Sequence, residues 1–120
     1  MSTQYNIAYV RGDTFKMTAQ YESASIPVSL VGATIVLTYK ASYKDADPGI
    51  FQLSTLTGEI VITSPSNGQF AITIPSAKTA LLEAPNLSGV YDCEVKLADG
   101  TRTTLLSGTF TLNLNVTRVL

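Results

Sequence analysis

The sequence predicts an all-β protein: an antiparallel sandwich of two sheets with one short helical turn, forming a single domain over residues 1–120. Three observations predict this fold. Apolar and polar residues alternate with a period of two along most of the chain, turn-forming residues divide these segments into seven or eight strands, and only one segment has helix signals. This layout is typical of a β-sandwich.

The clearest element is a long hairpin over residues 88–118. The first strand carries an apolar row at Tyr91, Cys93, Val95 and Leu97. The second strand carries a matching row at Phe110, Leu112, Leu114 and Val116. Between them, Asp99-Gly100 is predicted to be a two-residue turn, because such turns need residues that tolerate positive φ.

The earlier strands are predicted from the same alternation, at residues 4–10, 14–21, 33–42, 50–53, 59–63 and 69–75. Residues 26–30 are predicted to be a short extended piece that Pro27 confines to a sheet edge or to a segment crossing between sheets. The strand over residues 33–42 is expected to be central, with Ile35, Leu37 and Tyr39 on its buried face. Residues 76–84 are predicted to form one or two helical turns that Ser76 caps and Pro85 ends. Cys93, the single cysteine, is expected to be a small buried apolar residue.

Charge and composition exclude several partners. The net charge is −1 and the eight Lys and Arg residues are spread along the chain, so we expect no nucleic-acid binding. The apolar stretches are too short to span a bilayer, and residues 1–10 lack the basic start and apolar core of a secretion signal. A single cysteine points to folding in a reducing cytoplasm.

The residue types also argue against an enzyme and against a bound cofactor. The chain has no His, which removes the commonest general base and metal ligand. Asp92 and Glu94 are expected on the solvent-exposed face of a strand, where carboxylates are normally hydrated by water. Asp45 and Asp47, in the polar loop 43–49, offer only two of the six or more oxygens that Ca²⁺ needs, so no metal site is predicted. Arg11-Gly12-Asp13 is interpreted as a turn rather than as an adhesion motif.

Residues 87–93 resemble the corner before strand F of immunoglobulin-like domains, with Tyr91 two residues ahead of Cys93. The resemblance implies an immunoglobulin-like sandwich in which this Tyr bonds back to the upstream backbone. The partner Cys on strand B and the Trp on strand C of that family are missing here.

The order of motifs along almost the whole chain also resembles small virion proteins of tailed bacteriophages, and the layout is similar to the N-terminal module of phage baseplate upper proteins. The motifs that carry this resemblance are Arg11-Gly12-Asp13-Thr14-Phe15, residues 27–35 (PVSLVGATI), Gly68 to Ile74, Thr79 to Leu82, Gly89 to Val95, and Val116-Thr117-Arg118.

This likeness implies a non-enzymatic structural component of the virion, most specifically a tail, baseplate or fibre-attachment protein. Such a protein would be made in the bacterial cytoplasm, would be present in many copies per particle, and would contact other virion proteins of the capsid, tail or fibre. A capsid decoration (cement) protein and a carbohydrate-binding or adhesion sandwich remain alternatives; for sugar binding the candidate aromatic residues are Tyr39, Tyr43 and Phe51. The candidate contact surface consists of Tyr5, Ile7, Tyr9, Tyr43, Phe51, Val119 and Leu120.

Overall fold

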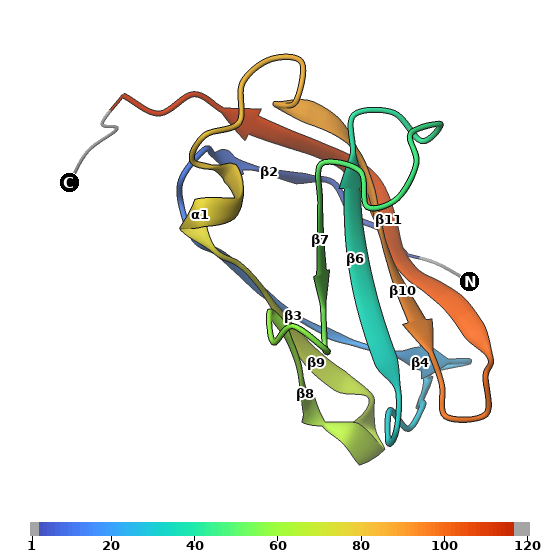
Figure 1. Cartoon of the computed structure of the whole chain (residues 1–120). Coiled ribbons are helices and arrows are strands. Elements are labelled where there is room, and N and C mark those ends of the chain that lie inside the picture. Colours follow the sequence, from blue (N-terminus) through green and yellow to red (C-terminus); the bar gives the residue numbers. More distant parts are fainter. Residues whose placement is uncertain (1–2, 117–120) are drawn as a thin grey trace.

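The computed structural model describes residues 3–116, which form two β-sheets packed face to face (Figure 1). The first sheet contains β1 (Thr3–Gln4), β2 (Ile7–Val10), β6 (Thr34–Lys40), β7 (Phe51–Ser54), β10 (Ser88–Lys96) and β11 (Arg102–Asn113). The second contains β3 (Phe15–Gln20), β8 (Ile60–Ser64) and β9 (Gln69–Ile74), while β4 (Glu22–Ser23) and β5 (Ile26–Pro27) form a separate hairpin. The helices are the 3-10 turn η1 (Pro65–Asn67) and α1 (Ser76–Thr79).

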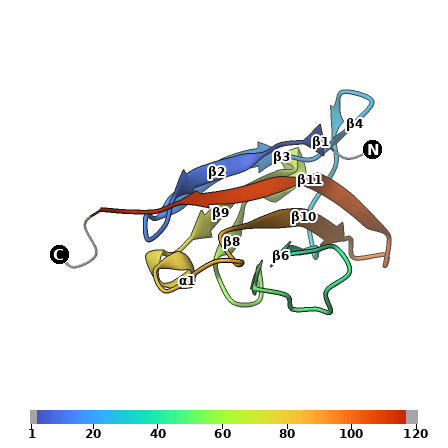
Figure 2. The same ribbon diagram turned by 90° about the horizontal axis from the view of Figure 1, so that it is seen from above.

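The sheet topology matches the predicted sandwich. The first sheet runs β1-β11-β10-β6-β7, with β2 also on the β1 side of β11, and the second runs β3-β9-β8. In the view from above, β3 and β9 of the second sheet are partly hidden by β2 and β11 of the first, and α1 lies at the end of the molecule toward which β11 runs (Figure 2). Within residues 3–116, no helix has the length and apolar character required to cross a membrane.

The core consists of the inward rows that the alternation predicted. On the central strand β6, Ile35, Leu37 and Tyr39 are fully buried. Phe110 of β11 lies at the middle of an aromatic cluster, stacked on Tyr39 with ring centroids 4.2 Å apart. The other rings around it are Tyr9, Phe51 and Tyr91. Cys93 is buried as predicted, and burial followed by the Asp92 charge raises the pKa of its thiol to about 12.

The first strand differs from its prediction. Residues 4–10 do not form one antiparallel strand, because the chain is interrupted between β1 and β2, and both strands run parallel to β11. The interruption is held by the Tyr5 N–H, which donates to the Ser107 carbonyl (2.8 Å), and by the Asn6 side chain, which accepts from the Thr109 N–H (3.0 Å). A Cβ on Gly108 would lie 2.6 Å from the Tyr5 carbonyl oxygen, so only glycine allows this approach.

The connection between β10 and β11 also differs from the predicted two-residue turn. The Leu97 N–H donates to the Thr101 carbonyl (2.8 Å), and the Gly100 N–H donates to the Leu97 carbonyl (2.9 Å), so three residues make the connection. Gly100 has a φ of +91°, whereas Asp99 has no positive φ and instead accepts the Thr101 N–H through its carboxylate. This is a type I turn followed by a left-handed glycine.

Strand β11 also departs from the simple alternation in its middle and at its end. A register shift opposite Cys93 and Glu94 inserts Leu105 as an extra residue, so that both Leu105 and Leu106 are buried. The strand ends at Asn113, and Leu114 and Val116, which were predicted to continue the buried row, are exposed.

The helical segment is shorter than predicted. Only Ser76–Thr79 is α-helical, and Pro75 rather than Ser76 occupies the N-cap, without a side-chain capping bond. Thr79, which is fully buried, accepts a hydrogen bond from the Gly12 N–H (2.8 Å). This contact ties α1 to the turn between β2 and β3.

The tyrosine corner is arranged differently from the family resemblance. Tyr91 donates its hydroxyl to the Tyr5 carbonyl, so it fastens β10 to the N-terminal segment. The residue that reaches the loop before β10 is Tyr39, whose hydroxyl donates to the Asn86 carbonyl (2.8 Å). Burial raises the pKa of the Tyr39 hydroxyl to about 12, as expected for a phenol inside a core.

Candidate binding surfaces

The outer face of the first sheet carries a polar hollow of about 790 Å³. On β6, the residues between the buried ones (Val36, Thr38 and Lys40) point outward because side chains alternate along a strand. Further lining residues come from the neighbouring strands and from the loop 41–50: Gln4, Tyr43, Asp47, Gln52, Val90, Asp92, Glu94, Arg102, Ser107 and Thr109. The hollow is a broad, open area with many hydrogen-bonding groups.

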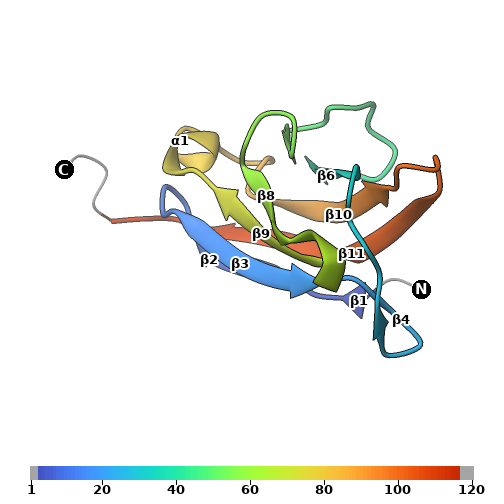
Figure 3. The ribbon, with the colours of Figure 1, turned by 90° about the horizontal axis from the view of Figure 1, so that it is seen from below.

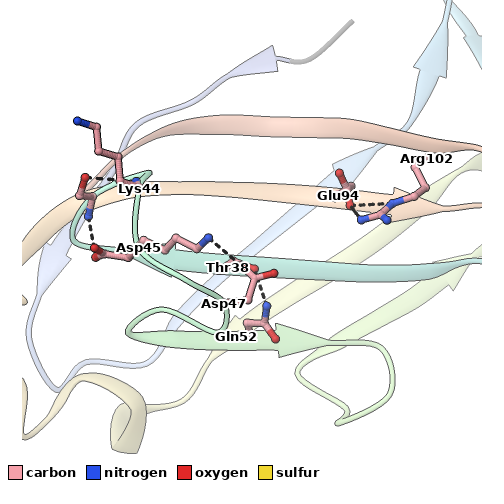
Figure 4. Close-up of polar contacts among 9 residues, drawn as sticks. Thr38, Lys44, Asp45, Asp47, Gln52, Glu94 and Arg102 are labelled. Atoms are coloured by element: carbon pink, nitrogen blue, oxygen red, sulfur yellow. Dashed lines mark hydrogen bonds and ion pairs between the residues drawn. The ribbon is translucent and has the colours of Figure 1, made fainter.

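Polar side chains in this hollow are already paired with one another (Figure 4). Lys40 lies 2.7 Å from the Asp47 carboxylate, which brings the loop 41–50 back over the sheet. Gln52 donates to the Thr38 hydroxyl (3.0 Å), and Arg102 pairs with Glu94 across the β10–β11 hairpin. Asp45 accepts the Ser42 N–H (3.2 Å) rather than facing Asp47, so the two loop carboxylates serve separate contacts.

In this hollow, the surroundings of Asp92 disfavour the ionised form of its carboxyl group relative to the protonated form. Partial burial is the largest cause and the neighbouring Glu94 the second, and together they raise the pKa of the Asp92 carboxyl above its usual value despite the opposite effect of Lys40. A ligand that donates hydrogen bonds or carries positive charge would relieve this cost.

The predicted contact residues divide into exposed and buried groups. Tyr43 is 77% exposed at the margin of the hollow, and Tyr5 is partly exposed. Ile7 and Phe51 are buried, so their prediction as contact residues is wrong: Ile7 lies opposite Phe110, and Phe51 lies opposite Tyr39. Tyr39, a candidate for sugar binding, is buried in the same core. Val119 and Leu120 lie outside the described residues.

Tyr9, another predicted contact residue, is half-buried. Its ring stacks on Phe15 with centroids 5.0 Å apart, which joins the first sheet to the second. The Tyr9 hydroxyl is buried, and it makes no hydrogen bond of ordinary geometry with the described residues. Burial raises the pKa of this hydroxyl to about 12, and the Thr79 side chain lowers the pKa by a smaller amount. Tyr9 therefore acts mainly as a packing residue.

Arg11 is the residue whose role the sequence did not reveal. It is only 2% exposed, so Arg11-Gly12-Asp13 is not an accessible adhesion loop. The guanidinium donates to the Leu82 carbonyl (2.9 Å), to the Glu83 carboxylate (3.2 Å) and to the Asn115 side chain (3.0 Å). No local pattern could have indicated this, because the partners are far away in the sequence.

These contacts of Arg11 gather exposed apolar side chains at one end of the sandwich. Leu81 next to Leu82 is 91% exposed, Val116 next to Asn115 is 98% exposed, and Leu114 is 59% exposed. Val10, directly before Arg11, is also exposed. We call Leu81, Leu114 and Val116 the exposed apolar residues beside the Arg11 contacts. Large apolar side chains in solvent can mark interaction sites.

Comparison with known proteins identifies the class of fold. No family model matches the chain, and no curated protein sequence matches it. Among solved structures, the chain is similar to the NK cell receptor Nkp44, with a TM-score of 0.54, 19% sequence identity, and coverage of 95% of this chain and 100% of the receptor chain. The protein is thus an immunoglobulin-like β-sandwich, as the sequence predicted, and this likeness concerns the fold alone.

Two further solved structures are similar over most of this chain at lower scores. A structure from a study of cell-adhesive interactions of VGSC beta subunits has a TM-score of 0.46 and 14% identity, with 93% of this chain and 92% of that chain covered. A structure of Drosophila OTK extracellular domains 3-5 has a TM-score of 0.40 and 18% identity, with 92% of this chain and 32% of that chain covered.

Proposed function

We propose that this chain is a non-enzymatic structural component of a tailed-phage virion, most specifically a tail, baseplate or fibre-attachment protein that works through protein–protein contacts. The order of sequence motifs from Arg11 to Arg118 supports the virion role. The observation in the structure that supports the contact role is the exposure of three large apolar side chains, Leu81, Leu114 and Val116, which a protein partner would cover.

The chemistry of the surfaces supports a scaffold rather than a catalyst. In the polar hollow, the basic groups Lys40 and Arg102 are each paired with a carboxylate, and Asp92 stands next to Glu94 on a strand. The single thiol, Cys93, is buried with a raised pKa, so it is a poor nucleophile. A rigid sandwich that carries little net charge suits a component present in many copies, which must meet neighbours without strong repulsion.

Labelling of particles tests this proposal. An antibody against the chain should decorate phage particles released from the host that carries its gene, and the chain should sediment with them. A Leu81→Asp variant should be incorporated poorly, whereas Leu56→Asp, which alters another exposed apolar residue in a turn, should be incorporated normally. Particles that contain none of the wild-type chain would overturn the proposal.

Carbohydrate binding is the second candidate, and the polar hollow is the observation that favours it. Tyr43 offers an exposed ring at the margin of the hollow, which is also lined by the Asp92 carboxylate and the Gln52 amide, groups that can contact sugar hydroxyls. Binding on a glycan array that is lost in Tyr43→Ala and kept in Tyr5→Ala would support this function. An array on which the wild-type chain binds no glycan would exclude it in favour of the structural role.

A further inference from the structure

Polar side chains form a row across the first sheet, inside the polar hollow. The strand register places five of them opposite one another, one on each of five neighbouring strands: Gln52 of β7, Thr38 of β6, Asp92 of β10, Ser107 of β11 and Gln4 of β1. All five line the hollow, and we call them the polar row. Because neighbouring strands lie about 4.8 Å apart, the row is about 19 Å long. It offers hydrogen-bonding groups at regular intervals to a ligand that lies across the strands.

Ion-paired side chains border the polar row on two sides. On one side Lys40 pairs with Asp47 (2.7 Å), whose loop 41–50 lies on the side of β10 away from β3 (Figure 3). On the other side Glu94 pairs with Arg102. The antiparallel register of β6 and β10 places Lys40 and Glu94 on opposite sides of the row. The row is therefore bordered by charged groups that already neutralise each other.

Asp92, in the middle of the polar row, has no such partner. Within residues 3–116, no hydrogen bond or ion pair engages its side chain. The charged groups that line the hollow are three carboxylates and two basic groups: Asp47, Asp92, Glu94, Lys40 and Arg102. One negative charge is thus left uncompensated at the centre of the hollow. A ligand with a single positive charge complements it, whereas an anionic ligand is repelled.

The chemistry of the hollow favours a sugar chain over a protein partner. The core of a protein–protein interface is rich in apolar and aromatic side chains. The hollow is instead lined mainly by hydroxyl, amide and charged side chains, with Val36 and Val90 as its aliphatic members. The strands β6, β10 and β11 have neighbours on both sides, so their backbone groups are not available to a peptide. Hydroxyl and amide side chains both donate and accept, which suits a ligand covered with hydroxyl groups.

We propose that the polar hollow binds a linear glycan that carries a free amino group, and that the glycan lies across the strands from Gln52 to Gln4 with this amino group at Asp92. The exposed Tyr43 ring lines the same hollow and can pack against a sugar ring. The inference rests on carbohydrate binding, the second candidate function, and adds to it the direction of the chain and the charge of the sugar. The virion role does not depend on it.

Calorimetric titration with linear tetramers of glucosamine, of glucose and of mannuronic acid tests the charge of the ligand. At slightly acidic pH, where the amine is protonated, the wild-type chain should bind the glucosamine tetramer most tightly and the mannuronic acid tetramer least. Asp92→Asn should weaken binding of the glucosamine tetramer roughly tenfold, because a charged hydrogen bond is lost, and should change binding of the glucose tetramer little. Asp99→Asn is the matched control, since Asp99 accepts the Thr101 N–H in an exposed turn outside the hollow.

Gln4→Ala and Gln52→Ala, at the two ends of the polar row, test the direction of the glycan. Each should weaken binding of the glucosamine tetramer, whereas a glucosamine dimer is too short to be affected by both. Thermal unfolding verifies that each variant is folded. A ligand that runs along β6 and β10 instead would not reach Gln4, so unchanged binding in Gln4→Ala would overturn the inference.

Three further outcomes would also overturn it: no binding of any of the tetramers, tightest binding of the mannuronic acid tetramer, or equal binding of a peptide of four lysines, which would indicate attraction to cations alone. These failures are distinct from failure of the underlying function. Binding of other glycans on an array, lost in Tyr43→Ala, would leave carbohydrate binding standing, and labelled particles would leave the virion role standing.

Discussion

The two sheets of this sandwich differ in how completely the chain covers them. In the first sheet, the inward row of β6 (Ile35, Leu37 and Tyr39) is fully buried, and β6 has a neighbour on each side. In the second sheet, the inward row of β3 (Phe15, Met17 and Ala19) is only partly buried, and β3 has one neighbour. Both rows have the same period and comparable side chains. The number of strand neighbours does not explain this difference by itself, because Phe51 and Leu53 are buried on β7, which also has one neighbour among the described residues.

The difference has its origin in the N-terminal segment. Both β1 and β2 pair with β11, so they extend the first sheet, and within residues 3–116 no strand pairs with the outer edge of β3. The Tyr9 ring, stacked on Phe15, closes the sandwich near the start of β3, but a hollow of about 50 Å³ beside Ala19 shows that closure is incomplete near its end. Among the described residues, β7 and β8 are edge strands as well, so β3 is one of several sheet edges that lack a second neighbour.

Core truncation should show the largest contrast between the two rows. Phe110→Ala removes the ring at the centre of the aromatic cluster and should lower the free energy of unfolding by about 3–5 kcal/mol. Met17→Ala on β3 should cost only about 1–2 kcal/mol, because part of that side chain is already in water. Urea denaturation of both variants measures the difference. Equal losses would mean that the inward row of β3 is as well packed as the aromatic cluster.

Arg11 lies where the chain crosses from the first sheet to the second, and its replacement should have the next largest effect. Arg11→Met should lower the free energy of unfolding by about 2 kcal/mol, because the buried carbonyl of Leu82 loses a charged donor. Glu83→Gln should change it by less than about 1 kcal/mol, since the Glu83 side chain is well exposed and remains solvated. If Glu83→Gln cost as much as Arg11→Met, the ion pair rather than the backbone contacts would hold the crossing.

The sequence predicted most of what depends on local alternation. The inward rows of β6, β9 and β10 were predicted correctly because a strand with one buried face has a period of two wherever it lies. The exposure of Tyr43 follows in the same way from the polar loop around it. These features need no knowledge of which strands are neighbours.

The predictions that failed concern features that depend on contacts between segments far apart in the sequence. Ile7 and Phe51 are buried because they lie opposite Phe110 and Tyr39, and no local signal identifies those partners. The pairing of β1 and β2 with β11, the extra residue Leu105 and the burial of Arg11 also depend on residues far away in the chain. Leu114 continues the alternation perfectly but is exposed, because the neighbouring strands end before it.

Hydrogen exchange should distinguish the edge strand β3 from the central strand β6. On β3 the amides of Lys16, Thr18 and Gln20, which point away from β9, should exchange at least roughly tenfold faster than those of Met17 and Ala19, a difference of about 1.4 kcal/mol in protection. On β6, successive amides from Val36 to Tyr39 should all be protected, because β7 and β10 pair with both sides. NMR exchange rates on the monomer give the result. Uniform protection along β3 would show that its outer edge is covered.

The smallest effect is expected on the outer face of the first sheet, at Asp92. Its pKa is raised, chiefly by burial and then by Glu94, so the folded state binds this proton more tightly than the unfolded chain does. Stability from this group is therefore fully present below the unfolded pKa near 4 and is lost as the pH rises above it.

Asp92→Asn should accordingly stabilise the protein at neutral pH, by roughly 0.5 kcal/mol because solvent screens this partly exposed group, and the gain should vanish as the pH falls below about 4. Thermal unfolding across that pH range measures it. Glu94→Gln is a poor substitute because Glu94 also pairs with Arg102. A gain that persisted in acid would have to come from packing or hydrogen bonding, since the charge difference between Asp and Asn disappears there. Relief of repulsion in the polar hollow would then not be the cause, and a cationic or hydrogen-bond-donating ligand would gain nothing from Asp92.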